Sequence, residues 1–386
     1  MSLPGSTRRA VICSNSSWYL SNFRSETIRA LLEDGWEVVA LAPEAEFAAE
    51  LEALGASFRQ VRMSRRSLSP LSNVGSFFSF YRLYRELRPD LVHHFTIKPV
   101  ILGGIAARLA RVRAIVQAVT GLGTAFTGSR LLRYPALLGF RLALGGGALT
   151  IFQNPEDRST LVEAGVVQPD RAILIRGSGV DLDRFAAPQR RERDQVTFVM
   201  ACRMLWSKGV REFVESGDRV AAAHPEARFV LIGAADAESR EGVPATWLEE
   251  ATATRPHLDW LGFVGDIAPI LREADVMVLP SYYGEGVPKS LLEGAAAGLP
   301  LVSTDMPGCR EVVTHEKTGL VVAPRDVSAL AGAMDRLLAE PSLRARCGAE
   351  ARRMVERDFA VEAVVQRTMD CYRSLLPPAL AARGGR

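Results

Sequence analysis

The sequence lacks the features that mark several common protein classes. Its five cysteines are widely spaced and form no Cys-x-x-Cys pair, so we expect neither a disulfide framework nor a zinc site. No apolar run reaches the ~20 residues that a membrane-spanning helix requires. The nearest, at residues 136–152, is interrupted by Arg141 and three consecutive glycines. A secretory signal is not expected either, since the first residues contain no clean apolar core.

A dinucleotide-binding fingerprint is also missing. The first predicted strand runs into Asn15-Ser16-Ser17 instead of Gly-x-Gly-x-x-Gly, and the nearest approximation, at residues 121–126, lacks the third glycine. The net charge of +3 is too small to indicate nucleic acid binding. What the 386 residues do contain is 48% apolar residues, enough for two domains with buried cores.

Short apolar runs alternate with helical segments along the chain. In the first half we predict strands at 9–14, 37–42, 91–94 and 114–119, and helices at 23–34, 44–54, 71–88 and 100–110. After a charged linker at 188–194, strands follow at 197–201, 228–232, 258–261, 276–279, 301–303 and 319–322. This alternation predicts two parallel sheets, each covered on both faces by helices.

Charged residues follow two predicted strands of the second half. Arg203 and Lys208 come just after the strand at 197–201, and Glu285 and Glu293 come after the strand at 276–279. The carboxyl ends of parallel strands form the edge at which ligands bind. Two cations suit a diphosphate, and two carboxylates suit the hydroxyl groups of a sugar. The pattern therefore predicts a nucleotide-sugar site.

The Arg…Lys-Gly segment at 203–209, with its Glu-x7-Glu partner at 285–293, resembles the family 4 retaining glycosyltransferases of GT-B fold. The resemblance covers most of the chain and is densest at 203–322. Residues 201–216 and the N-terminal half are most similar to enzymes that add N-acetylgalactosamine to undecaprenyl-diphosphate-linked sugars. The resemblance implies an α/β protein of GT-B fold, with two Rossmann-like doubly wound parallel-sheet domains facing across a cleft.

The same resemblance implies different roles for different segments of the chain. Residues 1–187 would form an acceptor-binding domain, and residues 188–359 a nucleotide-sugar-binding domain. Residues 360–386 would form a helix that crosses back to the first domain, followed by a tail. Arg203 and Lys208 would stabilise the leaving diphosphate, Glu285 would bind the transferred sugar, and Glu293 would bind the ribose. For the two glutamates, the alternative is a structural role at a helix N-terminus.

Further donor-binding residues are expected from the resemblance at Gly286, Val287, Lys289, Phe263, Val264, Asn15, Thr120 and Gly121. Pro288 stands where relatives often have glycine, so one backbone donor is lost at the start of the helix predicted from Val287. Two alternatives stay open for the Lys289 side chain: it would supply the phosphate contact that the missing Pro288 N–H cannot make, or it would face solvent. Relatives often carry a histidine near Thr120, and its absence leaves the donor sugar open.

No metal and no organic cofactor are expected besides the nucleotide-sugar donor, which the resemblance indicates is a UDP-sugar. Asp181-Leu182-Asp183 spells the Asp-x-Asp triplet of metal-dependent transferases, but its place in the linker favours a turn. His93, His94 and Lys98 follow one predicted strand. We leave open whether one of them faces the acceptor or the histidines are buried.

Aromatic residues at 77–84 lie on one predicted helix, near arginines at 62–66 and 82–88. They would form either the core face of the helix or a membrane contact. We therefore expect a hexosyltransferase that acts on a polyprenyl-diphosphate-linked or other glycan acceptor. It would be peripheral on the cytoplasmic face of an anionic membrane, with no nucleic acid partner. The alternatives are a sugar-nucleotide epimerase of the same fold and a non-catalytic binding protein. The donor sugar, the acceptor sugar, the linkage and the oligomeric state stay open.

Overall fold

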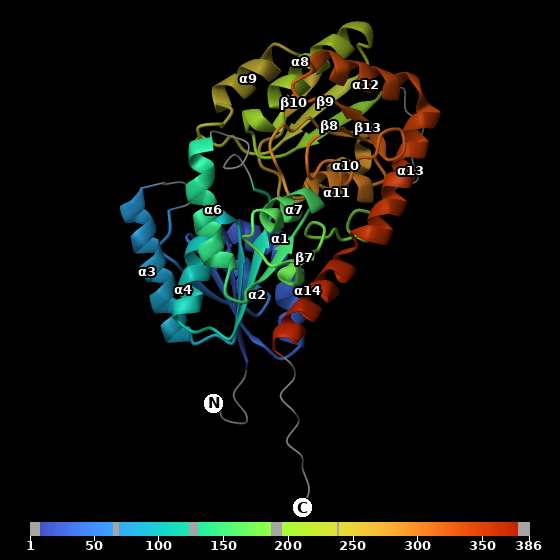
Figure 1. Cartoon of the computed structure of the whole chain (residues 1–386). Coiled ribbons are helices and arrows are strands. Elements are labelled where there is room, and N and C mark those ends of the chain that lie inside the picture. Colours follow the sequence, from blue (N-terminus) through green and yellow to red (C-terminus); the bar gives the residue numbers. More distant parts are fainter. Residues whose placement is uncertain (1–7, 65–68, 123–129, 187–194, 238, 377–386) are drawn as a thin grey trace, which may run out of the picture. The chain divides into compact units, whose positions relative to one another are not determined.

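The computed structural model describes residues 8–64, 69–122, 130–186, 195–237 and 239–376. The chain divides into two compact units, Met1–Ser178 with Glu362–Arg386 and Gly179–Val361. Each unit contains one parallel β-sheet with helices packed on it (Figure 1). The predicted α/β class with two parallel sheets is thereby confirmed. Val180 and Phe185, which the sequence analysis assigned to the first domain, pack in the core of the second unit.

The first unit has a sheet of seven strands in the order β3-β2-β1-β4-β5-β6-β7. The strands are β1 (Arg9–Cys13), β2 (Glu37–Ala42), β3 (Ser57–Gln60), β4 (Leu91–Phe95), β5 (Ala114–Val119), β6 (Leu149–Phe152) and β7 (Ala172–Leu174). The helices are α1 (Ser17–Glu33), α2 (Ala48–Ala53), α3 (Pro70–Leu87), η1 (Pro99–Gly103), α4 (Gly104–Leu109), α6 (Arg130–Leu144), α7 (Pro155–Glu163), η2 (Pro169–Arg171) and α14 (Val361–Leu375).

Both faces of this sheet are buried, and its central strands β1, β4 and β5 are mostly apolar, with His93, His94 and Gln117 as buried polar exceptions. In β1, Ile12 points to the face covered by α1 and α14, whereas Val11 points to the face covered by α3 and α4. Ser16 begins α1, and its hydroxyl accepts a hydrogen bond from the Tyr19 amide at 3.1 Å. The last helix, α14, contributes Val364 and Tyr372 to the core of the first unit.

The second unit has a sheet of six strands in the order β10-β9-β8-β11-β12-β13. The strands are β8 (Thr197–Ala201), β9 (Arg228–Ile232), β10 (Leu258–Trp260), β11 (Val276–Leu279), β12 (Leu301–Thr304) and β13 (Gly319–Val322). The helices are η3 (Trp206–Lys208), α8 (Val210–Ala223), α9 (Ala245–Ala253), α10 (Ala268–Glu273), α11 (Lys289–Ala296), α12 (Val327–Ala339) and α13 (Pro341–Asp358). The order of strands reverses between β8 and β11, which is the usual position of a ligand site in such a sheet.

Several predicted elements differ from the structure in instructive ways. The segment predicted as one helix at 100–110 begins as the π-turn η1, in which Gly103 packs on the His94 ring. One short edge strand, β3, was not predicted, because four residues give too little alternation to recognise. On the aromatic helix α3, Phe80 and Tyr84 are buried in the core while Phe78 is exposed. The core interpretation is thereby confirmed for Phe80 and Tyr84, and a membrane contact of Phe78 stays a prediction.

Candidate functional site

Two loops meet at the switch point of the second sheet. One leaves β8 and carries Arg203 and Lys208, and the other leaves β11 and carries Glu285. Tyr282 donates its backbone N–H to the Ser207 carbonyl at 2.9 Å. The Ser281 hydroxyl approaches the same carbonyl at 3.4 Å. The backbone therefore fixes the two charged loops against each other, as the parallel topology predicts.

Lys208 and Glu285 form a buried ion pair between these loops. Lys208 Nζ lies 2.5 Å from Glu285 Oε2, and each side chain is only 12% exposed. The turn that presents Lys208 requires glycine at the next position. Gly209 has φ 83°, and a Cβ there would lie 2.3 Å from the Pro280 carbonyl oxygen. Sequence reasoning predicted both charged residues at this edge but did not predict that they pair.

The Glu285 loop is also supported from the strand on its other side. Gly308, in the turn after β12, has φ 81°, and a Cβ there would lie 1.9 Å from the Gly286 carbonyl oxygen. The same atom would lie 2.7 Å from the Glu285 carbonyl oxygen. The absence of a side chain at Gly308 therefore sets the path of the backbone that carries Glu285.

Arg203 stands at the exposed end of the β8 loop. Its side chain is 57% exposed, and its guanidinium lies 3.9 Å from the Asp236 carboxylate. Gly233 lets β9 approach this loop closely, since a Cβ there would lie 1.8 Å from the Cys202 carbonyl oxygen. Arg203 is thus anchored through its backbone while its charge stays accessible.

Glu293 lies on α11, which begins at Lys289 after Pro288 and not at Val287 as predicted. Burial raises the pKa of Glu293, while the ammonium of Lys289, 3.7 Å away, acts in the opposite direction. Lys289 is only 14% exposed, so the interpretation that it faces solvent is wrong. The two side chains form an i, i+4 pair on one face of the helix.

The other predicted donor-binding residues lie in both units. Gly286 and the buried Val287 follow Glu285, whereas Phe263 is exposed and Val264 half-buried after β10. The remaining residues predicted to bind the donor, Asn15 after β1 and Thr120 and Gly121 after β5, belong to the first unit. Their role toward a donor stays a prediction.

The two histidines of β4 are buried, as one of the two open interpretations predicted. The Tyr84 hydroxyl lies 2.6 Å from His94 Nε2, and the Tyr372 hydroxyl lies 2.6 Å from His93 Nδ1. Burial lowers the pKa of His93 well below its ordinary value and that of His94 to about 3. Lys98 donates to the Ser64 carbonyl at 2.7 Å. The structure therefore gives neither histidine an acceptor-facing position.

The Asp-x-Asp triplet forms a turn. Asp181 Oδ1 accepts hydrogen bonds from the backbone N–H groups of Asp183 at 3.0 Å and Arg184 at 2.9 Å. Within the described ranges, no group of three or more His, Cys, Asp or Glu residues is arranged to hold a metal ion. The expectation that no metal is essential stays a prediction.

Sequence reasoning missed two cysteines next to the charged pair. Burial raises the pKa of the Cys202 and Cys309 thiols to about 12 in each case, and the Glu285 carboxylate acts in the same direction. Both thiols are therefore protonated and unreactive at neutral pH. The only sequence signal for them was that Cys202 precedes Arg203 and Cys309 follows Gly308.

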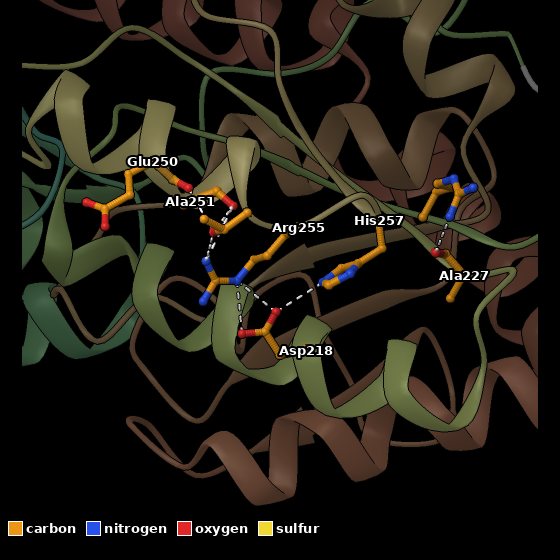
Figure 2. A network of polar contacts seen from close by, with 8 residues as sticks. Asp218, Ala227, Glu250, Ala251, Arg255 and His257 are labelled. Carbon is orange, nitrogen blue, oxygen red and sulfur yellow. Dashed lines mark hydrogen bonds and ion pairs between the residues drawn. The ribbon is translucent and has the colours of Figure 1, made fainter.

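A second polar cluster of this unit lies at the opposite, amino-terminal end of its strands. Arg255 and His257 immediately precede β10, and Figure 2 shows both side chains approaching the Asp218 carboxylate on α8. Arg255 Nε lies 2.8 Å and His257 Nε2 3.1 Å from Asp218 Oδ1. Because ligand sites of such sheets lie at the carboxyl ends of the strands, we interpret this cluster as structural support for α8 and β10.

The two parallel-sheet units have the GT-B fold of solved glycosyltransferases. Residues 195–340 match the family described as glycosyl transferases group 1, and residues 11–146 match the glycosyl transferase 4-like family. The protein therefore belongs to the glycosyltransferases that these two domains characterise.

Individual relatives agree with this assignment. The chain is 27% identical over 339 residues to the N,N'-diacetylbacillosaminyl-diphospho-undecaprenol alpha-1,3-N-acetylgalactosaminyltransferase of Campylobacter jejuni, covering 84% of this chain and 87% of that protein. It is 26% identical to an Escherichia coli UDP-Gal:alpha-D-GlcNAc-diphosphoundecaprenol alpha-1,3-galactosyltransferase, covering 73% and 75%. Among solved structures, Anabaena HepE in complex with UDP and glucose has a TM-score of 0.78 at 17% identity, covering 95% of this chain and 100% of that chain.

Proposed function

We propose that this glycosyltransferase retains the anomeric configuration and moves a hexose or N-acetylhexosamine from a UDP-sugar. The acceptor in this proposal is a sugar linked to polyprenyl diphosphate, or a related glycan. The observation that carries the proposal is the buried Lys208–Glu285 pair at the switch point of the second sheet. A UDP-sugar donor is supported by the galactosyltransferase relative and by the UDP in the HepE complex. Because the named relatives are transferases, the epimerase alternative has no support.

In this proposal, the bond from the anomeric carbon to the leaving phosphate oxygen breaks while the acceptor oxygen bonds to the same face of that carbon. The proton of the acceptor hydroxyl passes to the leaving phosphate oxygen. Lys208 and Arg203 stabilise the negative charge that grows on the diphosphate. The Glu285 carboxylate is ion-paired with Lys208. We therefore assign Glu285 to sugar binding and to electrostatic support of the oxocarbenium-like centre, and not to nucleophilic attack.

The test is incubation of the full chain with single UDP-hexoses and UDP-N-acetylhexosamines, each with and without a synthetic polyprenyl-diphosphate N-acetylhexosamine. An α-linked disaccharide on the lipid, identified by mass and by the proton coupling of the new linkage, is the expected product. A β-linked product would contradict retention. A new sugar nucleotide formed without acceptor would identify an isomerase instead.

The proposed role of Arg203 and Lys208 predicts how the transfer rate responds to a metal chelator. We expect EDTA to leave the initial transfer rate within about twofold of the untreated rate, because Arg203 and Lys208 supply the positive charge for the diphosphate. The control is a metal-dependent transferase assayed with the same EDTA batch. Loss of activity that Mg²⁺ or Mn²⁺ restores would contradict this prediction.

The proposed lipid acceptor requires a membrane-facing surface, and we place this surface on the first unit. In the described chain, no helix is both long and apolar enough to span a bilayer. On the helical layer of α3, α4 and α6, however, six large apolar side chains are more than half exposed: Leu71, Val74, Phe78, Leu109, Leu138 and Leu142. These helices lie side by side on one face of the first sheet (Figure 1).

On α3 the apolar residues continue into basic ones along a single stripe. Leu71, Val74 and Phe78 are spaced three and four residues apart, and the exposed Arg82 and Arg85 follow with the same spacing. Such a stripe suits an anionic lipid surface, with the apolar part inserted at the headgroup boundary. We propose that α3 docks the protein on the cytoplasmic face of the plasma membrane. Of the arginines that first suggested this, Arg62 is exposed, whereas Arg65 and Arg66 lie outside the described residues.

Liposome co-sedimentation tests the docking stripe. Replacing Arg82 and Arg85 with glutamine should weaken binding to anionic vesicles about 30-fold, since each basic residue contributes ~1 kcal/mol near such a surface. Raising the salt from 0.1 M to 1 M should weaken wild-type binding as well, because the Debye length falls from ~10 Å to ~3 Å. The matched control replaces the exposed Arg353 and Arg357 of α13 with glutamine and should bind like wild type. Equal binding of both double variants would show that the stripe is only a solvated surface.

A further inference from the structure

The first unit buries an arginine that has no carboxylate partner. Arg24 on α1 is only 5% exposed. Its guanidinium lies 4.1 Å from the centre of the Phe95 ring and donates to the Tyr19 hydroxyl at 2.9 Å. In the part of the chain that the structure describes, no Asp or Glu pairs with it and its Nε–H has no acceptor. A buried cation without a counter-charge costs several kcal/mol, which an aromatic ring offsets only in part.

A small cavity lies beside this arginine. Its volume is about 10 Å³, which is room for about one water-sized atom. Besides apolar groups, its wall contains Arg24, His93, Gln153 and Thr368. All of these residues belong to the first unit, and none of them carries negative charge.

His93 adds a second nitrogen to this wall. Its Nδ1 lies 2.6 Å from the Tyr372 hydroxyl, and its Nε2 is buried with no partner in the described structure. Burial and the nearby Arg24 charge lower the pKa of His93, so the imidazole is neutral, and burial raises the pKa of Tyr372, so its hydroxyl keeps its proton. When Tyr372 donates that proton to Nδ1, Nε2 carries the imidazole hydrogen. The cavity then has two N–H donors, at Arg24 and His93, that lack acceptors.

We propose that Arg24 binds an anion in this cavity, with one atom of the anion held by Arg24 Nε–H and His93 Nε2–H. The positive charge, the two donors and the absence of carboxylates select an anion over a neutral ligand. The size of the cavity admits a halide or a single oxygen of a phosphate group, and not a whole phosphate. The residues of this cavity belong to the first unit, whereas Lys208 and Glu285 belong to the second, and the proposal does not depend on the proposed transfer reaction.

The cavity lies beside the two segments at which the chain leaves and re-enters the first unit, so we expect a bound anion to stabilise both segments. Gly177 in its wall precedes the point where the chain leaves the first unit, at Ser178. Val364 and Thr368 follow the point where the chain returns, at Glu362. A bound anion therefore contacts both connecting segments, and we expect it to slow backbone hydrogen exchange in residues 172–178 and 362–372.

Crystals of the full chain soaked in bromide, and others soaked in inorganic phosphate, test the site directly. We expect an anomalous bromide peak, or a phosphate oxygen, in contact with Arg24 Nε. In solution, sodium chloride should raise the wild-type unfolding midpoint by about 4 °C over sodium gluconate of equal ionic strength, since a ligand of the native state stabilises it. Gluconate is too large for the cavity.

Variants separate a specific site from a general salt effect. Arg24→Gln should lose the chloride-dependent shift and Arg24→Lys should keep part of it. Arg113→Gln, an exposed arginine of the same unit, should keep all of it. A bromide peak identifies a free ion as the source, and a phosphate oxygen identifies a phosphate group. If Arg24→Gln does not fold, the wild-type soaks and Arg24→Lys decide. Three results would overturn the proposal. The first is water or no density at Arg24 in both soaks. The second is an adventitious ion only, seen in the crystal without a stability shift in solution, and the third is an equal chloride-dependent shift in Arg24→Gln.

Discussion

Arg203→Ala is expected to lower kcat/KM about 10²–10³-fold, the scale for losing one contact to transition-state charge. The same change should leave thermal unfolding nearly unaltered. The Arg203 side chain is 57% exposed and lies 3.9 Å from its acidic neighbour Asp236, and such exposed pairs contribute little to stability. The measurements are steady-state kinetics with the donor that the UDP-sugar screen identifies, together with an unfolding curve for each variant.

Lys208→Ala should lose a similar amount of activity but should also destabilise the protein. Removing the ammonium takes away the opposite charge beside the Glu285 carboxylate, which is only 12% exposed, and breaking a buried ion pair costs about 3–5 kcal/mol. Both residues follow the same strand, but Lys208 is only 12% exposed whereas Arg203 is 57% exposed, so we expect a loss of stability for Lys208→Ala alone. Arg219→Ala, which changes an exposed arginine of α8, is the control for both variants and should keep the wild-type kcat/KM. Near-wild-type turnover in both Arg203→Ala and Lys208→Ala would remove the donor-site assignment.

Gly308→Ala should have a comparably large effect, although residue 308 carries no chemical group. The added Cβ would lie 1.9 Å from the Gly286 carbonyl oxygen, so the backbone that carries Glu285 must move. A displacement of about 1 Å at a reacting centre costs about 10²-fold in rate. We also expect a loss of about 1–3 kcal/mol in the free energy of unfolding, from overpacking and from the positive φ.

The matched control for Gly308→Ala is Gly332→Ala. Gly332 lies within α12, and a Cβ there meets no atom within 4 Å. Alanine at this position should leave kcat/KM unchanged and should stabilise the protein by about 0.5–1 kcal/mol, because glycine is unfavourable inside a helix. A Gly308→Ala enzyme with wild-type kinetics would show that the backbone after β12 does not position Glu285.

Much of the fold could be predicted because the sequence repeats one strong pattern. The central strand β11 is apolar throughout and β8 is apolar after Thr197, and the structure places both at the predicted residues. The edge strand β3 was not predicted because it is short and largely exposed. The aromatic run on α3 was ambiguous because core and surface residues alternate there within one helical turn.

The charges of the candidate site could be predicted, but their pairing could not. Their position after β8 and β11 follows from the parallel topology, whereas the contact between Lys208 and Glu285 depends on loop backbones that meet through Ser207 and Tyr282. Tertiary distances also explain why Gly308 gave no functional signal, since its neighbour Gly286 is remote in sequence. Arg24 gave none because one arginine in a helix is ordinary until its burial is known.

Isothermal titration with UDP tests most directly whether the second unit binds the nucleotide of the donor. We expect UDP to bind the wild type in preference to GDP and ADP. Glu293→Gln should bind UDP about 10–100-fold more weakly, because a hydrogen bond to a charged group is worth about 1.5–3 kcal/mol. Glu249→Gln, on the exposed face of α9, is the matched control and should bind like wild type. If no nucleoside diphosphate binds, or if Glu293→Gln and the wild type bind UDP equally well, the second unit does not bind the donor nucleotide through Glu293.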